Sequence, residues 1–173
     1  MKRFSLAMLA LLTCAGAQAA SEEVQMNLVT AQGVGQSVGS VKISETDKGL
    51  EFAPDLNALP PGEHGFHVHA KGSCQPAIKE GKPSAAEAAG GHLDPQKTGK
   101  HEGPEGEGHL DDLPVLVVNN DGKATDAVVA PRLKKLDEVK GKALMIHVGG
   151  DNMSDQPKPL GGGGARYACG VIK

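Results

Sequence analysis

Short runs of β-forming residues, separated by turn signals, extend through most of this 173-residue chain and restrict its fold more than any other feature. The stretches SETDKGLEF and VVNNDGKAT place Asp, Asn and Gly between apolar runs, a pattern typical of β-hairpins. No segment keeps a helical period over several turns; APRLKKLDEV comes nearest and is short. The predicted strands span residues 24–31, 39–44, 49–53, 65–70, 115–119, 125–130, 143–148 and 168–172.

Eight short strands without long helices predict an all-β fold, an eight-stranded antiparallel Greek-key barrel or sandwich. Two connections are unusually long: residues 71–113, rich in Gly, Pro, His and charge, and residues 149–166. Loops of this length in a compact domain are usually functional or disordered. The first loop holds three histidines and a cysteine, so we expect it to be pinned to the barrel and both loops to be functional.

The first 19 residues have the order of a secretory signal peptide. Lys2 and Arg3 give a basic start, residues 6–12 form an apolar run too short to span a membrane, and residues 17–19 (AQA) provide a small-residue cleavage site. We therefore expect residues 20–173 to form a single exported domain, with cleavage after Ala19 or Ala20.

The form of this leader is typical of bacteria, which predicts the periplasm as the compartment. Lipid attachment at Cys14 is an alternative to simple cleavage, although Thr13 differs from the Gly or Ala expected before a lipidated cysteine. No other apolar run approaches the ~20 residues of a membrane span, so the mature protein is expected to have no membrane contact.

Removal of the leader changes the charge and the cysteine count. The mature chain has 16 basic and 21 acidic residues, a formal charge of −5, so nucleic acid is not an expected partner. Cys74 and Cys169 remain, and in an oxidising compartment two cysteines most simply form one disulfide. Two buried free thiols are the alternative, which export disfavours.

The stretch PGEHGFHVHA holds three of the seven histidines. Because side chains alternate along a strand, His67 and His69 share one face, opposite Phe66 and Val68 on the core side. Two imidazoles at i and i+2 are close enough for one metal ion to contact both. His64 lies on the other face, where a structural histidine bonded to the backbone is expected.

Further histidines recur with spacings that suit metal binding. In ALMIHVGGD, alternation places His147 with Met145 on the polar face, with Leu144, Ile146 and Val148 opposite. The long loop adds His92, His101, His109 and Asp112. Imidazoles suit copper or zinc, and three imidazoles with a carboxylate suit tetrahedral zinc. Spacing alone does not decide between two metal ions and a single metal ion with histidines left over.

Four motifs in family order resemble the copper,zinc superoxide dismutases, and in particular the bacterial periplasmic branch: GFHVHAKGSC, GGHLDPQKTGKHEGPEGEGHLDD, HVGGDN and GGARYACGVI. The resemblance covers about residues 24–173. The resemblance implies a copper ion and a zinc ion in each chain, joined by His92 as a bridging imidazolate. The implied copper ligands are His67, His69, His92 and His147. The implied zinc ligands are His92, His101, His109 and Asp112.

The same resemblance implies roles for residues around the metals. Asp151 would accept hydrogen bonds from His67 and His101, and Arg166 would bind and orient the superoxide anion beside the copper. The disulfide would tie the first loop to the last strand. Asp111, just before the implied ligand Asp112, is expected to be a solvated neighbour. Candidate residues for attracting the anionic substrate are Lys71, Lys79 and Lys158, which the sequence does not rank.

The implied activity is dismutation of superoxide to oxygen and hydrogen peroxide by alternate reduction and reoxidation of copper, with a structural zinc and with His92 taking up a proton. A metal buffer is one alternative, but it would need neither Arg166 nor a bridging histidine. A cupin is another, but cupins have a Glu where this chain has Ser73 and Cys74. The scarcity of aromatic residues leaves little for an apolar interface, which favours a monomer over a homodimer.

Overall fold

The structure is a computed structural model that describes residues 20–173, so the predicted signal peptide and Cys14 lie outside it. The strands are Ser21–Thr30 (β1), Gly33–Glu45 (β2), Leu50–Leu56 (β3), Gly62–His64 (β4), Phe66–His69 (β5), Ala77–Lys79 (β6), Lys82–Ser84 (β7), Leu116–Val118 (β8), Val128–Ala130 (β9), Ala143–His147 (β10) and Arg166–Val171 (β11). Three short 3-10 turns are Glu87–Ala89 (η1), Leu136–Glu138 (η2) and Leu160–Gly162 (η3). No helix among the described residues has the length and apolarity needed to cross a membrane.

The strands form a curled antiparallel sheet in the order β5-β10-β11-β1-β2-β3-β9, and β4 pairs separately with β8. Only Gly65 separates β4 from β5, so this segment continues the ladder from β8 to β10. Counted in this way, eight strands surround the core, and non-consecutive strands such as β3 and β9 lie side by side. The predicted eight-stranded Greek-key barrel is confirmed, and each predicted strand overlaps an observed one.

The predicted start of β2 and one predicted hairpin were wrong. β2 begins at Gly33 rather than Gly39, because pairing with β1 from Thr30 onwards outweighs the low strand propensity of this Gly- and Ser-rich segment. The Asn119–Gly122 turn forms, with the Asn119 side chain accepting hydrogen bonds from the amides of Asp121 and Lys123. However, β8 pairs with β4 and β9 pairs with β3, so the flanking strands do not form a hairpin.

The core is almost entirely aliphatic, as the scarcity of aromatic residues requires. Phe52 and Phe66 pack edge to face, with ring centroids 6.0 Å apart, and Val, Leu, Ile and Ala side chains together with Met26 make up the rest of the buried cluster. The predicted alternation holds in β5, where Phe66 and Val68 are fully buried in this cluster. It fails at Val148, which is 52% exposed, because β10 ends at His147, where its ladder with β11 is irregular.

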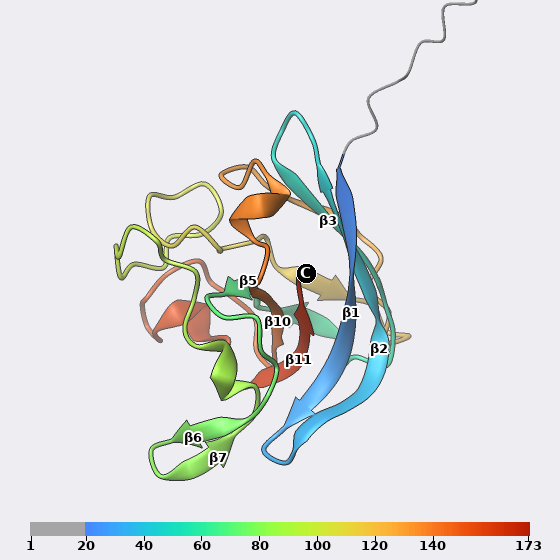
Figure 1. The fold of residues 1–173 in the computed structure, drawn as a ribbon, viewed down its shortest axis with the longest axis vertical. Coiled ribbons are helices and arrows are strands. Elements are labelled where there is room, and N and C mark those ends of the chain that lie inside the picture. The colour runs from blue at the N-terminus through green and yellow to red at the C-terminus, as the bar shows by residue number, and fades with distance from the viewer. Residues whose placement is uncertain (1–19) are drawn as a thin grey trace, which may run out of the picture.

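The two long loops lie beside β5 and β10, on the side away from β1 and β2 (Figure 1). The first loop is pinned, as predicted, but it also contains the β6–β7 hairpin, which was not predicted. The guanidinium of Arg132 donates to the carbonyl oxygens of Gly108 and His109. A disulfide joins Cys74, at the start of this loop, to Cys169 in β11. The loop is therefore fixed to the barrel at both ends.

Candidate metal centre

Seven of the predicted site residues meet where the first loop lies against β5. Isolated antiparallel bridges pair His69 with His92 and His67 with Asp112, so the loop runs beside β5 like an added strand. The amide of Leu93 donates to the carbonyl oxygen of Val68 at 3.0 Å. This backbone pairing places the loop histidines over the face of β5 that carries His67 and His69.

The predicted copper set, His67, His69, His92 and His147, is brought together: its ring nitrogens lie within 4.8 Å of one another. Three of these rings use one nitrogen to donate a hydrogen bond away from the group. Nε2 of His67 donates to Asp151 at 2.6 Å, Nδ1 of His69 to the Gly90 carbonyl at 2.9 Å, and Nδ1 of His147 to the Gly164 carbonyl at 3.1 Å. The other nitrogen of each ring is left to face the group.

The predicted zinc residues converge on one oxygen. Oδ1 of Asp112 lies 2.8 Å from Nδ1 of His101, 3.7 Å from Nδ1 of His92 and 4.0 Å from Nδ1 of His109. The other oxygen, Oδ2, accepts from the amides of Glu102 and Gly103, which fixes the carboxylate. These residues divide between two overlapping groups that share His92 and Asp112; one includes His67 and His101, and the other includes His109 and Asp111.

His92 belongs to all three groups. Both of its ring nitrogens are buried, and neither has a hydrogen-bond partner. Its ring centroid lies 4.4 Å from that of His67 and 5.2 Å from that of His109. His92 is therefore placed between the two sets, with one nitrogen available to each.

The carboxylate of Asp151 contacts one histidine of each predicted metal set. One of its oxygens accepts from Nε2 of His67 at 2.6 Å, and the other lies 2.8 Å from Nε2 of His101. The amide of Met153 also donates to this carboxylate at 2.8 Å. Asp151 thus has the position that the sequence resemblance implied, and it orients one ring of each set.

His64 is separate from these groups, as predicted. Its Nδ1 lies 2.8 Å from the carbonyl oxygen of His147, and its Nε2 lies 2.8 Å from that of Pro60. Both ring nitrogens are occupied by backbone oxygens, so His64 has no nitrogen left for a metal. It links the β4 strand to the end of β10 and is a structural residue.

The prediction for Asp111 was wrong, because its side chain is completely buried rather than solvated. Its Oδ2 lies 3.1 Å from Nδ1 of His92 without hydrogen-bond alignment, and both of its oxygens lack a hydrogen-bond partner. Alternation along the chain could not reveal this position, because residues 110–113 belong to an irregular loop.

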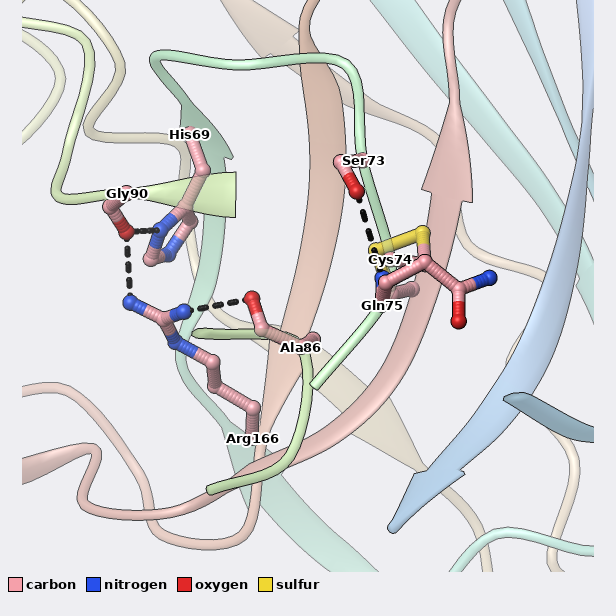
Figure 2. Close-up of a disulfide and its surroundings, with 8 residues drawn as sticks. His69, Ser73, Cys74, Gln75, Ala86, Gly90 and Arg166 are labelled. Atoms are coloured by element: carbon pink, nitrogen blue, oxygen red, sulfur yellow. Dashed lines mark hydrogen bonds between the residues drawn. A yellow bond between two sulfur atoms is a disulfide. The ribbon is translucent and has the colours of Figure 1, made fainter. Parts of the chain in front are cut away.

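Arg166, at the start of β11, is held by the first loop (Figure 2). Its Nη1 donates to the carbonyl of Ala86 at 2.6 Å, and its Nη2 donates to that of Gly90 at 2.5 Å. Glu87 lies 3.4 Å from Nη1. Because these acceptors are backbone oxygens, no side-chain motif could have identified them in the sequence.

The candidate lysines differ in their surroundings. Lys79 pairs with Glu87 at 3.7 Å, which partly neutralises it. Lys71 is exposed, and its side chain lies over Gly90, which accepts from Arg166. Lys158 lies similarly over Gly162 in the second loop. Lys71 and Lys158 are therefore better placed than Lys79 to add positive charge near the site.

The protonation of the rings differs between the two sets. Burial lowers the pKa of His69 and lowers that of His147 to about 3, so both rings are neutral, as metal ligands must be. Burial would also lower the pKa of His101, but the carboxylates of Asp112 and Asp151 outweigh it and raise the pKa to about 10. Asp111 and Asp112 similarly raise the pKa of His92 to about 9.

The unpaired atoms fit two metal ions. The buried side-chain atoms without a hydrogen-bond partner include Nδ1 of His67, both nitrogens of His92, Nδ1 of His101 and His109, and Oδ1 of Asp112. Buried polar atoms are nearly always paired, so a concentration of unpaired donors at one place indicates a missing partner. Four imidazoles suit copper, and three imidazoles with a carboxylate suit zinc.

The family model for copper/zinc superoxide dismutase matches residues 37–172. Over all 173 residues, and over the full length of both relatives, the chain is 84% identical to the Cu-Zn superoxide dismutase of Escherichia coli strain K12 and 82% identical to Cu-Zn superoxide dismutase 2 of Salmonella typhimurium. Two solved structures are similar. The Brucella abortus Cu/Zn superoxide dismutase has a TM-score of 0.88 and 56% identity, with 89% of this chain and 100% of that chain covered.

The second is the monomeric copper, zinc superoxide dismutase from Salmonella enterica, with a TM-score of 0.81, 82% identity and the same coverage. The family match spans most of the chain, and the identity to the relatives extends over its full length. The chain belongs to the copper/zinc superoxide dismutase family, oxidoreductases that dismutate superoxide with one copper and one zinc ion per chain.

Proposed function

We propose that His67, His69, His92 and His147 bind the copper ion and that His92, His101, His109 and Asp112 bind the zinc ion. The hydrogen bonds of the first set support the copper assignment, because they use the opposite ring nitrogens and leave Nδ1 of His67 and Nε2 of His69 and His147 facing the set. The Nε2 atoms of His69 and His147 are only 3.3 Å apart, close enough for one ion to contact both. Asp112 supports the zinc assignment, because Oδ1 faces three Nδ1 atoms.

The observation that carries this proposal is the state of His92. It lies between the two sets with two buried and unpaired nitrogens, which suits an imidazolate bridging two cations. With both metals bound, His92 would serve both sets, because its Nδ1 lies on the side of Asp111 and Asp112 and its Nε2 is left for the copper set. Nε2 is also the atom that can take up and release a proton during the reaction.

Copper, when bound, would supply the one-electron chemistry by which one superoxide is oxidised to oxygen and a second is reduced to hydrogen peroxide. Arg166 binds and orients the anion, because its guanidinium is held by the carbonyls of Ala86 and Gly90 and always carries its charge. A proton held at Nε2 of His92 can pass to the second superoxide. Asp151 keeps the rings of His67 and His101 in place throughout.

We also propose that this dismutation protects the periplasm and that the protein acts there as a monomer. The basic and then apolar order of residues 1–19 supports export. The Cys74–Cys169 disulfide fits an oxidising compartment. The Salmonella enterica relative, 82% identical, is described as monomeric, which supports the same state for this chain.

The bridge can be tested by spectroscopy. Protein loaded with Cu(II) in the first set and Co(II) in the second should give a copper electron paramagnetic resonance signal that is strongly broadened, because one imidazolate couples the two spins. The variant His92→Gln should restore an isolated copper signal with both metals bound. An isolated copper signal in the doubly loaded wild-type protein would contradict the bridge.

A further inference from the structure

Asp111 is a buried carboxylate that the proposed ligand sets do not use. Its side chain has no exposed surface, and neither oxygen has a hydrogen-bond partner. Among the described residues, its only ion-pair contact is with Nδ1 of His92, at 3.1 Å. The guanidinium of Arg132, which donates to the carbonyls of the preceding residues Gly108 and His109, forms no ion pair with Asp111.

A buried carboxylate needs a counter-charge or several hydrogen-bond donors, because it loses its hydration without replacement. In the metal-loaded protein, His92 can supply neither a positive charge nor a hydrogen-bond donor to Asp111. Once Nδ1 of His92 binds zinc, it has no proton to donate, and Asp111 would lose its only contact. The remaining positive charge within reach of Asp111 would then be the metal ion itself.

The geometry points to Asp111 as a further donor to the zinc ion, so that two carboxylates, from Asp111 and Asp112, bind it together with the imidazoles. This inference rests on the zinc site proposed above. The donor atoms of His92, His109, Asp111 and Asp112 lie within 4.8 Å of one another. Two donors that are each 2.0–2.2 Å from one zinc ion are roughly 3–3.5 Å apart, and the contact between Asp111 and His92 has this length.

The second carboxylate changes the charge of the site. Two carboxylates neutralise a divalent zinc ion, and each carboxylate occupies a buried position that becomes favourable only with the cation present. Asp111 should therefore raise the affinity for zinc. The effect should be specific to zinc, because the one group of donor atoms that includes Asp111, among the described residues, otherwise consists of the zinc-set residues His92, His109 and Asp112.

The test uses full-length mature protein loaded with zinc alone. X-ray absorption at the zinc edge should give five nitrogen or oxygen donors for the wild type and four for Asp111→Asn. Competition with a chelator should show about tenfold or greater loss of zinc affinity in this variant. Asp126→Asn is the matched control, because it removes the same charge from an exposed position, and it should behave as the wild type.

Four donors in the wild-type protein would overturn the inference without reference to any variant, which guards against a variant that fails to fold. Equal zinc affinity in Asp111→Asn and the wild type would also overturn it. The zinc site itself is tested separately by His101→Gln and His109→Gln. If neither variant weakens zinc binding, the proposed zinc site fails; if both do and Asp111→Asn does not, only the role of Asp111 fails.

Discussion

Arg166 and His69 donate hydrogen bonds to the same carbonyl oxygen, that of Gly90 (Figure 2). One backbone atom in the first loop thus positions both a proposed copper ligand and the cation proposed to bind the substrate. The other guanidinium nitrogen, Nη1 of Arg166, donates to the carbonyl oxygen of Ala86. The distance between the metal and the anion-binding group is therefore set by the loop, not by the two side chains alone.

Replacing Arg166 should separate catalysis from metal binding. Arg166→Ala should lower the rate of superoxide consumption by roughly a hundredfold, the order found when a fixed donor to a reacting anion is lost, with copper content unchanged. Arg166→Lys should give an intermediate rate, because an ammonium group keeps the positive charge but cannot donate to the carbonyls of Ala86 and Gly90 with the paired geometry of a guanidinium. Stopped-flow decay of superoxide and elemental analysis measure the two quantities. A full rate in Arg166→Ala would contradict the proposed role.

Asp151 should influence both metals, because its two oxygens bind one ring of each set. Asp151→Asn should weaken the binding of copper and of zinc, each by about 10- to 100-fold, as expected when a carboxylate that orients a ligating histidine is lost. Asp126→Asn again provides an exposed control. Chelator competition for each metal gives the affinities. If Asp151→Asn weakened the binding of only one of the two metals, Asp151 would not couple the two sets.

The disulfide should stabilise the loop that holds Arg166. It closes 95 residues of chain, for which the chain-entropy estimate is about 4–5 kcal/mol. The double variant Cys74→Ser/Cys169→Ser should melt roughly 10–20 °C lower than the oxidised wild type. It should also release copper faster, since the carbonyls of Ala86 and Gly90 follow Cys74 in the same loop. Calorimetry and copper retention test this, and unchanged values of both would contradict it.

Zinc affinity should increase with pH. In the metal-free protein, Asp112 and Asp151 raise the pKa of His101 to about 10 against the opposing effect of burial, so zinc must displace a proton from this ring at neutral pH. Apparent affinity should rise about tenfold per pH unit for each proton displaced, and level off near pH 10. Asp151→Asn should flatten this dependence. Chelator competition between pH 6 and 9 measures it, and a flat wild-type profile would exclude a protonated His101.

The same pKa shift affects the stability of the metal-free fold in a defined direction. The pKa of His101 is higher in the folded chain than the ordinary value of about 6.5. Its contribution is therefore fully present below pH 6.5 and is lost as the pH rises towards 10. Bound zinc should remove this alkaline loss, because the ring is then neutral at every pH in the range.

Local periodicity predicted the parts of the site that lie on strands. Alternation separated His67 and His69 from Phe66 and Val68, and it assigned His64 to the backbone, because a strand repeats every two residues. The loop ligands have no such period. His92, His101, His109 and Asp112 could be assigned only by resemblance to a family, since their positions depend on long-range pairing of the loop with β5.

Features that depend on the backbone could not be predicted at all. The carbonyls of Gly90 and Gly164, which orient His69 and His147, have no side-chain signature. The burial of Asp111 depends on how the loop passes over β5, where the amide of Val68 faces the carbonyl of Asp111. The extension of β2 to Gly33 similarly follows from pairing rather than propensity.

The proposed copper site is tested most directly by a copper titration of the zinc-loaded protein, with superoxide decay measured at each step. The rate should rise linearly, reach a plateau at one copper ion per chain, and stay at background in His147→Gln. Dismutation without added copper, or a plateau at a different stoichiometry, would contradict the proposed site.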